Sequence, residues 1–318
     1  MFIVRTSEYV PARIVDNEYF SKILDKPAKW FIERTGINER RRCAPDENLH
    51  TLAIAAVKAL QAQDVPLAEI DLIIGASYTP LDTIGTLAHV IQREFRLGGA
   101  RAIYLSTACS SFMDALDIAH MYFKAGGVRQ ALIVAAEHNS AYARDDDVAS
   151  GHLWGDGASA VLLSAAQRGS QFEIVQIETK GLADLGHGPD AVSLRMESGL
   201  RMPFGPEVFA QACQEMTRAI RNILAGHGLS SEDVRLMVAH QANKRIIDWV
   251  ASELRFPPER VAVTIDSLGN TGCASVAITL HRFASQVLPG EFAVLVTFGG
   301  GYSVGAALLR RTAEGVEA

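Results

Sequence analysis

The 318-residue sequence has little of what marks membrane, nucleic-acid-binding or secreted proteins. Its longest uninterrupted apolar run is six residues, whereas a membrane-spanning helix needs roughly 20. The net charge of −6 gives no support for nucleic-acid binding. The first residues lack the basic and long apolar regions of a secretory signal. We therefore expect a cytoplasmic protein without membrane attachment.

Cysteine is also scarce, and its four positions, 43, 109, 213 and 273, are widely scattered. There is no CxxC pair and no zinc-ligand spacing, so we expect no metal site and a reduced protein. Apolar residues make up 48% of the chain and charged residues 21%, which is ordinary for a soluble globular protein. A chain of this length suits one large domain or two of medium size.

The most informative feature that is present is a long-range internal repeat. The sequence TACSS at 107–111 is echoed by TGCAS at 271–275, an offset of 164 residues. The same offset aligns the apolar segment 72–74 with 236–238 without a gap. Two matches at one offset, about half the chain length, predict a duplicated architecture.

Short β-rich apolar runs alternate with helical stretches, which is typical of an α/β fold with a sheet buried on both faces. The expected strands are 71–75, 102–105, 131–135, 158–163, 236–239, 262–265, 293–298 and 305–309. The expected helices are 52–63, 86–95, 110–124, 207–226, 243–254 and 273–287. Residues 180–206, rich in glycine and proline, predict a long excursion and a junction between halves. We place the halves at 1–168 and 169–318.

Cys109 is the candidate nucleophile, because it stands where an expected buried strand turns into an expected buried helix. Apolar residues cover nearly the whole circumference of helix 110–124, which is typical of a helix in a protein interior. The unpaired N–H groups and the dipole at a helix N-terminus stabilise a thiolate, the reactive form of cysteine. The alternative interpretation is a small buried hydrophobic residue.

His240 and Asn270 strengthen the catalytic interpretation. His240 follows the expected strand 236–239, at the carboxyl edge where α/β sheets bind ligands. Asn270 precedes the buried helix of the second half, and a turn or N-cap role is its alternative. If pseudo-symmetry relates the halves, the starts of the two helices face each other and the three side chains converge.

Glycines 299–301 follow the expected strand 293–298 and can present N–H groups to a developing oxyanion. Their spacing fits neither GxGxxG nor a phosphate loop, so nucleotide binding is disfavoured. Asp156, in the sequence WGDG, is interpreted as a structural turn residue. The order Cys, His, Asn fits a papain-like protease or thioester chemistry. The CGSCW signature of the protease is missing, and the internal repeat also argues against it.

Six motifs make the chain resemble β-ketoacyl-acyl-carrier-protein synthase III, in the thiolase-like superfamily. They are WFIERTGI at 30–37, TAC at 107–109, WGDG at 154–157, HQAN at 240–243, GNT at 269–271 and FGGG at 298–301. The resemblance covers nearly the whole length. It implies a thiolase-like α/β fold of duplicated βαβαβαββ halves in a five-layer αβαβα sandwich. It also implies a homodimer, an acyl carrier protein as partner, and thioester substrates without a cofactor.

The resemblance implies roles for individual residues. Cys109 would take an acyl group from a thioester, with the N–H groups of Cys109 and Gly300 as the oxyanion hole. His240 and Asn270 would stabilise the enolate of a malonyl- or β-ketoacyl-carrier-protein for a Claisen-type condensation. The other implied positions are the pantetheine entrance (Trp30, Arg34, Asn243), carrier-protein docking (Lys244, Arg245) and an acyl-pocket gate contributed to the neighbouring subunit (Ile84). The arginine run 40–42 is a further docking candidate, with a solvated surface as the alternative.

Several positions depart from the family pattern. Val148 stands where an arginine contacts coenzyme A, and Pro206 stands where an asparagine is usual. Val304 replaces a tryptophan, and Gly272-Cys273 replaces Ser-Ala. These changes predict a specialised synthase for a longer or carrier-bound acyl group, in a specialised fatty acid or polyketide pathway.

Four other functions stay open. Two are enzymes of the same fold: an ester- or amide-forming acyltransferase without decarboxylation, and a dialkylresorcinol-type condensing enzyme. The more remote ones are a cysteine hydrolase and a non-catalytic partner, and the intact Cys109 argues against the latter.

Overall fold

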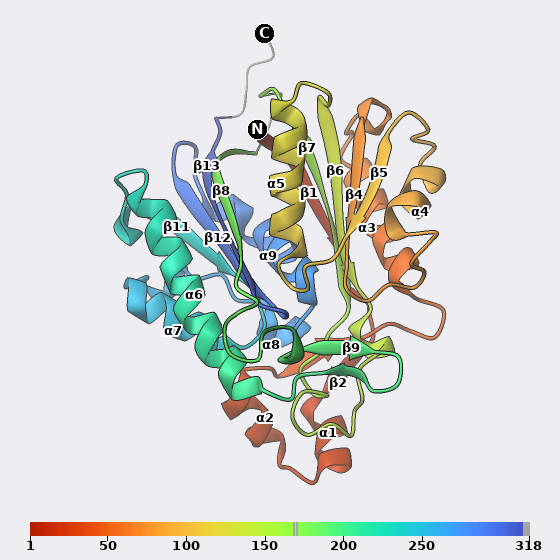
Figure 1. Cartoon of the computed structure of the whole chain (residues 1–318), viewed down its shortest axis with the longest axis vertical. Coiled ribbons are helices and arrows are strands. Elements are labelled where there is room, and N and C mark those ends of the chain that lie inside the picture. The colour runs from red at the N-terminus through yellow and green to blue at the C-terminus, as the bar shows by residue number, and fades with distance from the viewer. Residues whose placement is uncertain (168, 170, 314–318) are drawn as a thin grey trace.

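The computed structural model describes residues 1–167, 169 and 171–313. Its longer strands are β1 (Phe2–Tyr9), β4 (Leu72–Ala76), β5 (Arg101–Leu105), β6 (Gln130–Glu137), β7 (Gly157–Ser164), β8 (Phe172–Gly181), β11 (Val234–Ala239), β12 (Phe292–Gly299) and β13 (Ser303–Arg311). They join into one sheet in the order β11-β12-β13-β8-β1-β7-β6-β4-β5 (Figure 1). Two ribbons pair the shorter strands, β2 (Ile14–Asp16) with β3 (Glu39–Arg41) and β9 (Ser193–Arg195) with β10 (Gly199–Arg201).

The two ends of the sheet repeat one topology. In the N-terminal part, β1, β7 and β6 are successively antiparallel, and β6, β4 and β5 are parallel. In the C-terminal part, β8, β13 and β12 are successively antiparallel, and β12 and β11 are parallel. The parts meet where β1 pairs with β8 at Phe2–Glu173 and Ile3–Phe172. The boundary expected after residue 168 falls at a position outside the described residues.

The helices form three layers around the two parts of the sheet. On the N-terminal part lie α3 (Leu49–Gln61) and α4 (Leu87–Glu94), and on the C-terminal part lies α6 (Gly205–Ala225), with α7 (Lys244–Leu254) packed against it. The middle layer is α5 (Ser111–Lys124) and α9 (Ser275–Phe283), each of which contacts strands of both parts. The result is the expected five-layer α/β arrangement.

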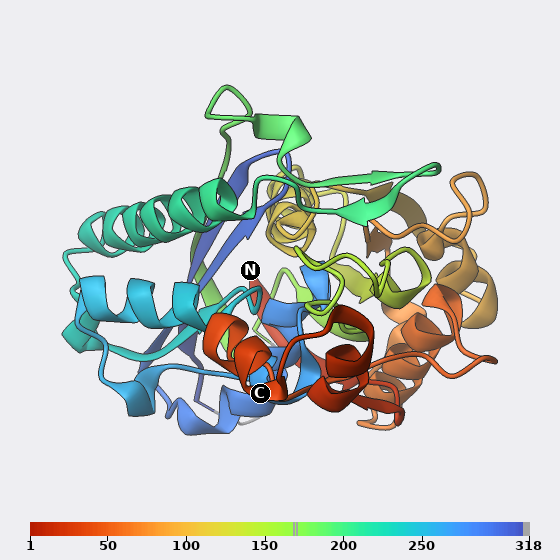
Figure 2. The same ribbon diagram turned by 90° about the horizontal axis from the view of Figure 1, so that it is seen from below.

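The remaining helices lie at one end of the molecule. They are α1 (Asn17–Leu24), α2 (Ala28–Thr35) and the single turn α8 (Ile265–Leu268). Figure 2 looks onto this end, where α1 packs against α2 and α2 contacts α7. Gly36, directly after α2, packs so closely on Lys244 that an added Cβ would lie 2.4 Å from the Lys244 Cβ. No helix of the described ranges is long and apolar enough to cross a membrane.

Two sequence-based expectations about the fold are wrong, and two strands were missed. The expected strand 262–265 does not form, and the only nearby strand pairing among the described residues is a single bridge between Met237 and Val261, just before this range. The chain turns there into α8, because Gln241 Oε1 accepts hydrogen bonds from Thr264 N and Ile265 N at 2.9 and 3.1 Å. The excursion 180–206 contains the β9–β10 ribbon but is not a junction, since it follows β8, which already pairs with β13. Strands β1 and β8 were not expected, because their charged residues obscure the apolar pattern.

Candidate active site

Cys109 lies in the tight turn between β5 and α5. Ala108 before it has φ 52°, in the left-handed region that non-glycine residues rarely adopt. Ser110 N donates to Thr107 O at 3.2 Å and closes the turn. Gly299, at the end of β12, packs directly on this turn, so an added Cβ would lie 2.7 Å from Thr107 O and 3.1 Å from Cys109 N. The first of the three glycines is therefore required to bring the glycine loop against the thiol.

His240 directly follows β11, and its backbone N donates to Val296 O at 2.8 Å. Its Nδ1 lies 2.7 Å from Ser275 Oγ, which also accepts a hydrogen bond from Gln241 N at 3.3 Å. When the Ser275 hydroxyl donates to Nδ1, the proton of the neutral imidazole lies on Nε2. Burial lowers the pKa of His240 to about 4, so the ring is neutral at pH 7. A neutral imidazole can donate a hydrogen bond to a substrate oxygen without bringing a charge into the site.

Asn270 is fixed by its backbone and by one atom of its side chain. Its N donates to Leu153 O at 2.9 Å, and its O accepts from Gly155 N at 3.0 Å, which places Gly155 of the WGDG motif against Asn270. Its Oδ1 accepts a hydrogen bond from Gly272 N at 2.9 Å. Because Oδ1 is committed to this turn, Nδ2 is the group that Asn270 can offer to a substrate.

The structure brings Cys109, His240, Asn270 and Gly300 to the lining of one cavity of about 40 Å³. The rest of its lining is mainly apolar and comes from Trp154, Val192, Met202, Val208, Ala212, Met216, Ala242, Ile246 and Phe298. Met202 also lines a wider cavity of about 370 Å³, so the two cavities adjoin at this residue. Thiol, imidazole, amide and backbone N–H groups thus converge in an apolar site.

Sequence reasoning missed Glu137, Tyr78 and Ser275. Burial raises the pKa of the Cys109 thiol to about 12, and the Glu137 carboxyl raises it further, whereas the Gly300 N–H and the Tyr78 hydroxyl lower it. Burial also raises the pKa of Glu137, to about 7, although hydrogen bonds from neighbouring groups lower it in part. The sequence signal that could have revealed Glu137 is a carboxylate at the end of an apolar strand, because α/β sheets place functional groups at that position.

The expected entrance residues lie around the wider cavity. Arg34 and Asn243 line it directly. Trp30 lies beside it, with the Arg34 guanidinium 4.7 Å from its ring centroid and the ring of His152, another lining residue, at 5.6 Å. Asn243 caps α7 by accepting from Arg245 N at 2.9 Å and donates to Arg34 O at 3.1 Å. It therefore ties the start of α7 to the end of α2 and shapes the mouth.

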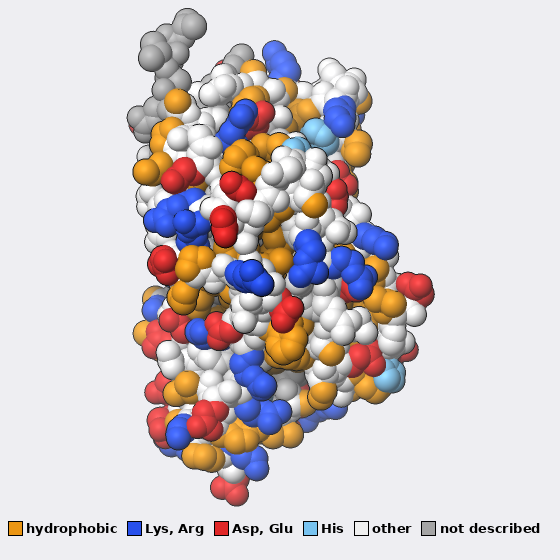
Figure 3. Space-filling model, turned by 90° about the vertical axis from the view of Figure 1, so that its left-hand side faces the viewer, with side chains coloured by type: hydrophobic (Ala, Val, Ile, Leu, Met, Phe, Trp, Pro, Cys, Tyr) orange, Lys and Arg blue, Asp and Glu red, His pale blue; other side chains and the backbone are white. Residues whose placement is uncertain are grey.

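The two expected docking residues differ in their surroundings. Lys244 Nζ is paired with Asp248 at 2.7 Å. Arg245 lines the wider cavity, with its guanidinium 5.4 Å from the Phe209 ring centroid. The face of the molecule that contains α6 and α7 carries basic and acidic side chains interspersed (Figure 3). Of the two, Arg245 is the one placed at the mouth.

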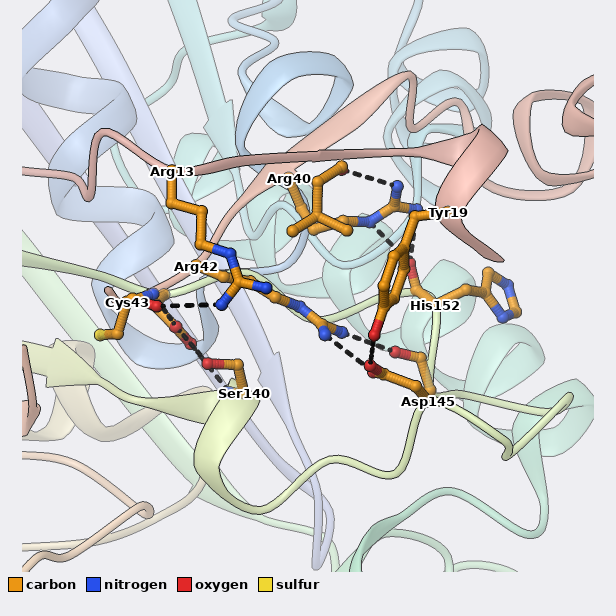
Figure 4. A network of polar contacts seen from close by, with 11 residues as sticks. Arg13, Tyr19, Arg40, Arg42, Cys43, Ser140, Asp145 and His152 are labelled. Atoms are coloured by element: carbon orange, nitrogen blue, oxygen red, sulfur yellow. Dashed lines mark hydrogen bonds and ion pairs between the residues drawn. The ribbon is translucent and has the colours of Figure 1, made fainter. Parts of the chain in front are cut away.

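The interpretation of the arginine run 40–42 as a docking surface is wrong for Arg40 and Arg42 (Figure 4). Arg40 is completely buried and donates to His152 O at 2.7 Å and to Asn17 Oδ1 at 3.0 Å. Arg42 is buried and paired with Asp145 at 2.8 Å. The sequence pattern could not show this, because arginine is usually exposed and becomes buried only where partners satisfy its five N–H groups.

Asp156 is a structural turn residue, as the sequence suggested. It is buried and accepts hydrogen bonds from Cys43 N and Ser140 N, both at 2.8 Å. Donor atoms of Cys43, His138 and Asp156 lie within 4.8 Å of one another. Burial, followed by the nearby Asp156, holds the pKa of Cys43 far above its usual range. A protonated thiol beside a hydrogen-bonded carboxylate fits a structural cluster better than a metal site.

Ile84 is 86% exposed in its own chain, on the loop before α4. Val148, at the position where the resemblance implies an arginine, is 48% exposed. Pro206 lines the wider cavity near the start of α6.

Comparison with known proteins identifies the family of the chain. Residues 104–181 match the family described as 3-oxoacyl-[acyl-carrier-protein (ACP)] synthase III, and residues 224–311 match its C-terminal family. The β-ketoacyl-[acyl-carrier-protein] synthase III of Alkalilimnicola ehrlichii is 37% identical over 97% of this chain and 98% of its own length.

Solved structures give the same result. The crystal structure of 3-oxoacyl-[acyl-carrier-protein] synthase III from Aquifex aeolicus has a TM-score of 0.90 at 34% identity, covering 97% of this chain and 99% of that one. The priming β-ketosynthase of the R1128 polyketide pathway has a TM-score of 0.88 at 30% identity, covering 99% and 97%. The chain belongs to the β-ketoacyl-[acyl-carrier-protein] synthase III family of acyl-transferring condensing enzymes.

Proposed function

We propose that this enzyme takes an acyl group onto Cys109 and condenses it with a carrier-protein-bound malonyl or β-ketoacyl thioester. The observation that carries the proposal is the apolar cavity in which Cys109, His240, Asn270 and Gly300 meet. Its substrates are thioesters, and every group that the reaction needs is supplied by the chain.

In the first half-reaction, the Cys109 sulfur attacks the thioester carbonyl of the acyl donor. The N–H groups of Cys109 and Gly300 hold the developing oxyanion, and the leaving thiolate takes the proton that Cys109 gives up. Apolar walls keep water from the acyl-enzyme, because water would hydrolyse it.

In the second half-reaction, a malonyl thioester loses carbon dioxide and leaves an enolate. The enolate oxygen accepts hydrogen bonds from His240 Nε2 and Asn270 Nδ2. Its carbon attacks the acyl carbonyl, the carbon–sulfur bond breaks, and uptake of one proton restores the Cys109 thiol. The lowered pKa of His240 supports this role, because a neutral ring on the Ser275 hydroxyl keeps a proton on Nε2.

We further propose that the acyl donor is carrier-bound and belongs to a specialised fatty acid or polyketide pathway. Val148 is exposed beside the acidic residues 145–147, a poor setting for the phosphates of coenzyme A. Asp145 is paired with Arg42 and Asp146 with Arg144, which holds the loop in place and partly offsets its charge. Arg245 at the mouth suits an acidic carrier protein.

We also propose a homodimer. Strand β5 is an edge of the sheet, and an edge with open backbone groups is a template for pairing with a second chain. Met121, towards the end of α5, is 56% exposed, and Ile84 is 86% exposed. The Ile84 loop of one subunit would then reach the partner subunit and act as its acyl-pocket gate.

The decisive experiment is intact-mass analysis after incubation with a panel of acyl-coenzyme A and acyl-carrier-protein thioesters. We expect an acyl adduct in the wild type and in Cys213→Ala, because the Cys213 thiol is on the buried face of α6, and none in Cys109→Ala. An adduct that survives Cys109→Ala contradicts the nucleophile assignment.

Added malonyl-carrier-protein separates condensation from simple acyl transfer. Release of carbon dioxide with loss of the adduct supports decarboxylative condensation. Loss of the adduct to an alcohol or amine, without carbon dioxide, supports the ester- or amide-forming alternative instead.

A further inference from the structure

The hydroxyl group of Tyr78 is buried beneath the active site without a good hydrogen-bond partner. Tyr78 stands two residues after β4, in the turn 77–79. Its oxygen is shielded from solvent and forms no hydrogen bond of normal geometry with a described residue. Burial raises the pKa of Tyr78, and a weak hydrogen bond with the Asn139 side chain opposes that rise. Buried hydroxyl groups are almost always paired, so an exception calls for a reason.

The surroundings of this hydroxyl are those of the active site. Burial and then the Glu137 carboxyl raise the pKa of Cys109, whereas the Gly300 N–H and the Tyr78 hydroxyl lower it as donors. An added Cβ at Gly272 would lie 2.4 Å from the Tyr78 oxygen. The hydroxyl therefore packs against the turn that holds Asn270, close enough to the Cys109 sulfur to influence its pKa.

Glu137, at the end of β6, holds the turn in place. Its carboxylate accepts hydrogen bonds from Tyr78 N at 3.2 Å, from Thr79 N at 3.1 Å and from Ser77 Oγ at 3.0 Å. The Tyr104 hydroxyl donates to Ser77 O at 2.7 Å from the neighbouring strand β5. Such a clamp leaves Tyr78 little freedom to turn its hydroxyl away from Cys109.

The absence of a side chain at Gly272 leaves space for the Tyr78 ring. The φ of +57° at Gly272 is in the left-handed region, and any side chain there would collide with the tyrosine oxygen at 2.4 Å and with Cε1 at 2.8 Å. The family pattern has a serine at this position, and the departure to glycine makes room for the tyrosine ring. The two residues form one matched feature next to the thiol.

We propose that the Tyr78 hydroxyl donates a hydrogen bond to the Cys109 sulfur whenever that sulfur carries negative charge. This rests on the proposed function, in which the sulfur is charged twice: as it attacks the donor and as it leaves the condensation product. A thiol or thioester sulfur is a weak acceptor, and a thiolate is a strong one. In the resting enzyme the hydroxyl therefore has only weak contacts, such as that with the Asn139 side chain, and it gains a strong acceptor when the charge forms.

Tyr78→Phe tests the proposal, because it removes the hydroxyl and keeps the ring against Gly272. The measurement is the pH dependence of Cys109 alkylation by iodoacetamide, followed by mass. We expect the apparent pKa of Cys109 to rise by about one unit and the rate at neutral pH to fall about tenfold, the effect of one charge-assisted hydrogen bond. Glu137, Cys273 and His240, the other titratable groups around the thiol, stay in place.

Tyr104→Phe is the matched control, since it removes a hydroxyl from the same turn. An alkylation profile of Tyr78→Phe that equals that of the wild type overturns the proposal. So does an equal shift in Tyr104→Phe, because the effect would then come from the turn rather than from the hydroxyl.

A second variant covers a failure of Tyr78→Phe to fold. Placing 3-fluorotyrosine at position 78 keeps the shape and makes the hydroxyl a stronger donor, so the apparent pKa of Cys109 should fall. An unchanged or raised value contradicts the proposal. Alkylation needs no thioester, so these results are independent of whether acylation and condensation occur.

Discussion

At the scale of single residues, the hydrogen bond between Ser275 Oγ and His240 Nδ1 leaves Nε2 as the imidazole nitrogen without this partner. Ser275→Ala removes the partner of Nδ1 at 2.7 Å. We expect decarboxylation of malonyl-carrier-protein to slow about tenfold, because the ring loses its orientation, while acylation of Cys109 changes less. The measurement is carbon dioxide release compared with adduct formation. Ser267→Ala, in the half-buried part of α8, is the control, and an equal loss in both half-reactions would contradict the assignment.

Glu137 predicts a pH-dependent contribution to stability. Burial raises its pKa from 4.5 to about 7 in the folded state. A raised carboxyl pKa contributes stability that is fully present below about pH 4.5 and is lost as the pH rises through 7. We therefore expect the stability difference between the wild type and Glu137→Gln to change between pH 4.5 and 8, in the direction that disfavours the wild type at high pH. Urea unfolding across this range measures it, and a constant difference would contradict the assignment.

At the scale of elements, the glycine loop after β12 depends on close backbone packing. Gly299→Ala would place a Cβ 2.7 Å from Thr107 O, in the turn that holds Cys109. We expect a loss of more than about 2 kcal/mol in unfolding free energy, together with loss of acylation. Gly98→Ala is the control, because an added Cβ there meets nothing within 4 Å. Thermal unfolding and adduct mass report the outcome, and a fully acylated, stable Gly299→Ala would show that the packing is not required.

Arg40, in the ribbon β2–β3, has a buried guanidinium that links Asn17 of α1 to the loop that contains His152. Arg40→Leu leaves Val15 O, His152 O and Asn17 Oδ1 without their donor. We expect unfolding free energy to fall by about 3 kcal/mol, because buried acceptors lose their partner. Arg41→Leu, at the partly exposed neighbouring position, should cost much less. Reduced carrier-protein binding without reduced stability in Arg40→Leu would restore the docking interpretation.

At the scale of the whole molecule, the proposed dimer can be tested through Ile84. Ile84→Asp changes a side chain that is 86% exposed in the single chain, so the fold should not depend on it. We expect the wild type to sediment as a dimer and the variant dimer to dissociate at protein concentrations where the wild-type dimer persists, or the variant to lose acylation by longer acyl groups. The reason is that burying a charge in an apolar pocket is costly. Leu288→Asp, another exposed apolar position, is the control. A monomeric wild type would contradict the dimer and the gate together.

The local sequence determined a large part of this protein by itself. The pattern of apolar runs separated by turn residues predicted seven strands of the main sheet. The internal repeat, with its offset of 164 residues, predicted the duplicated topology. The motifs around Cys109, His240 and Asn270 predicted which residues share a cavity, because each motif fixes a local turn at the end of a strand or the start of a helix.

Only the tertiary structure decided the roles that depend on partners distant in sequence. Arg40 is buried because Asn17 and the His152 carbonyl satisfy it, and no pattern at 40–42 shows that. The strand expected at 262–265 is lost because Gln241 captures its N–H groups. Tyr78 reaches the active site only because Glu137 holds its turn and Gly272 leaves room for its ring. Burial, hydrogen-bond satisfaction and steric fit are properties of packed neighbours, which the chain brings together only when it folds.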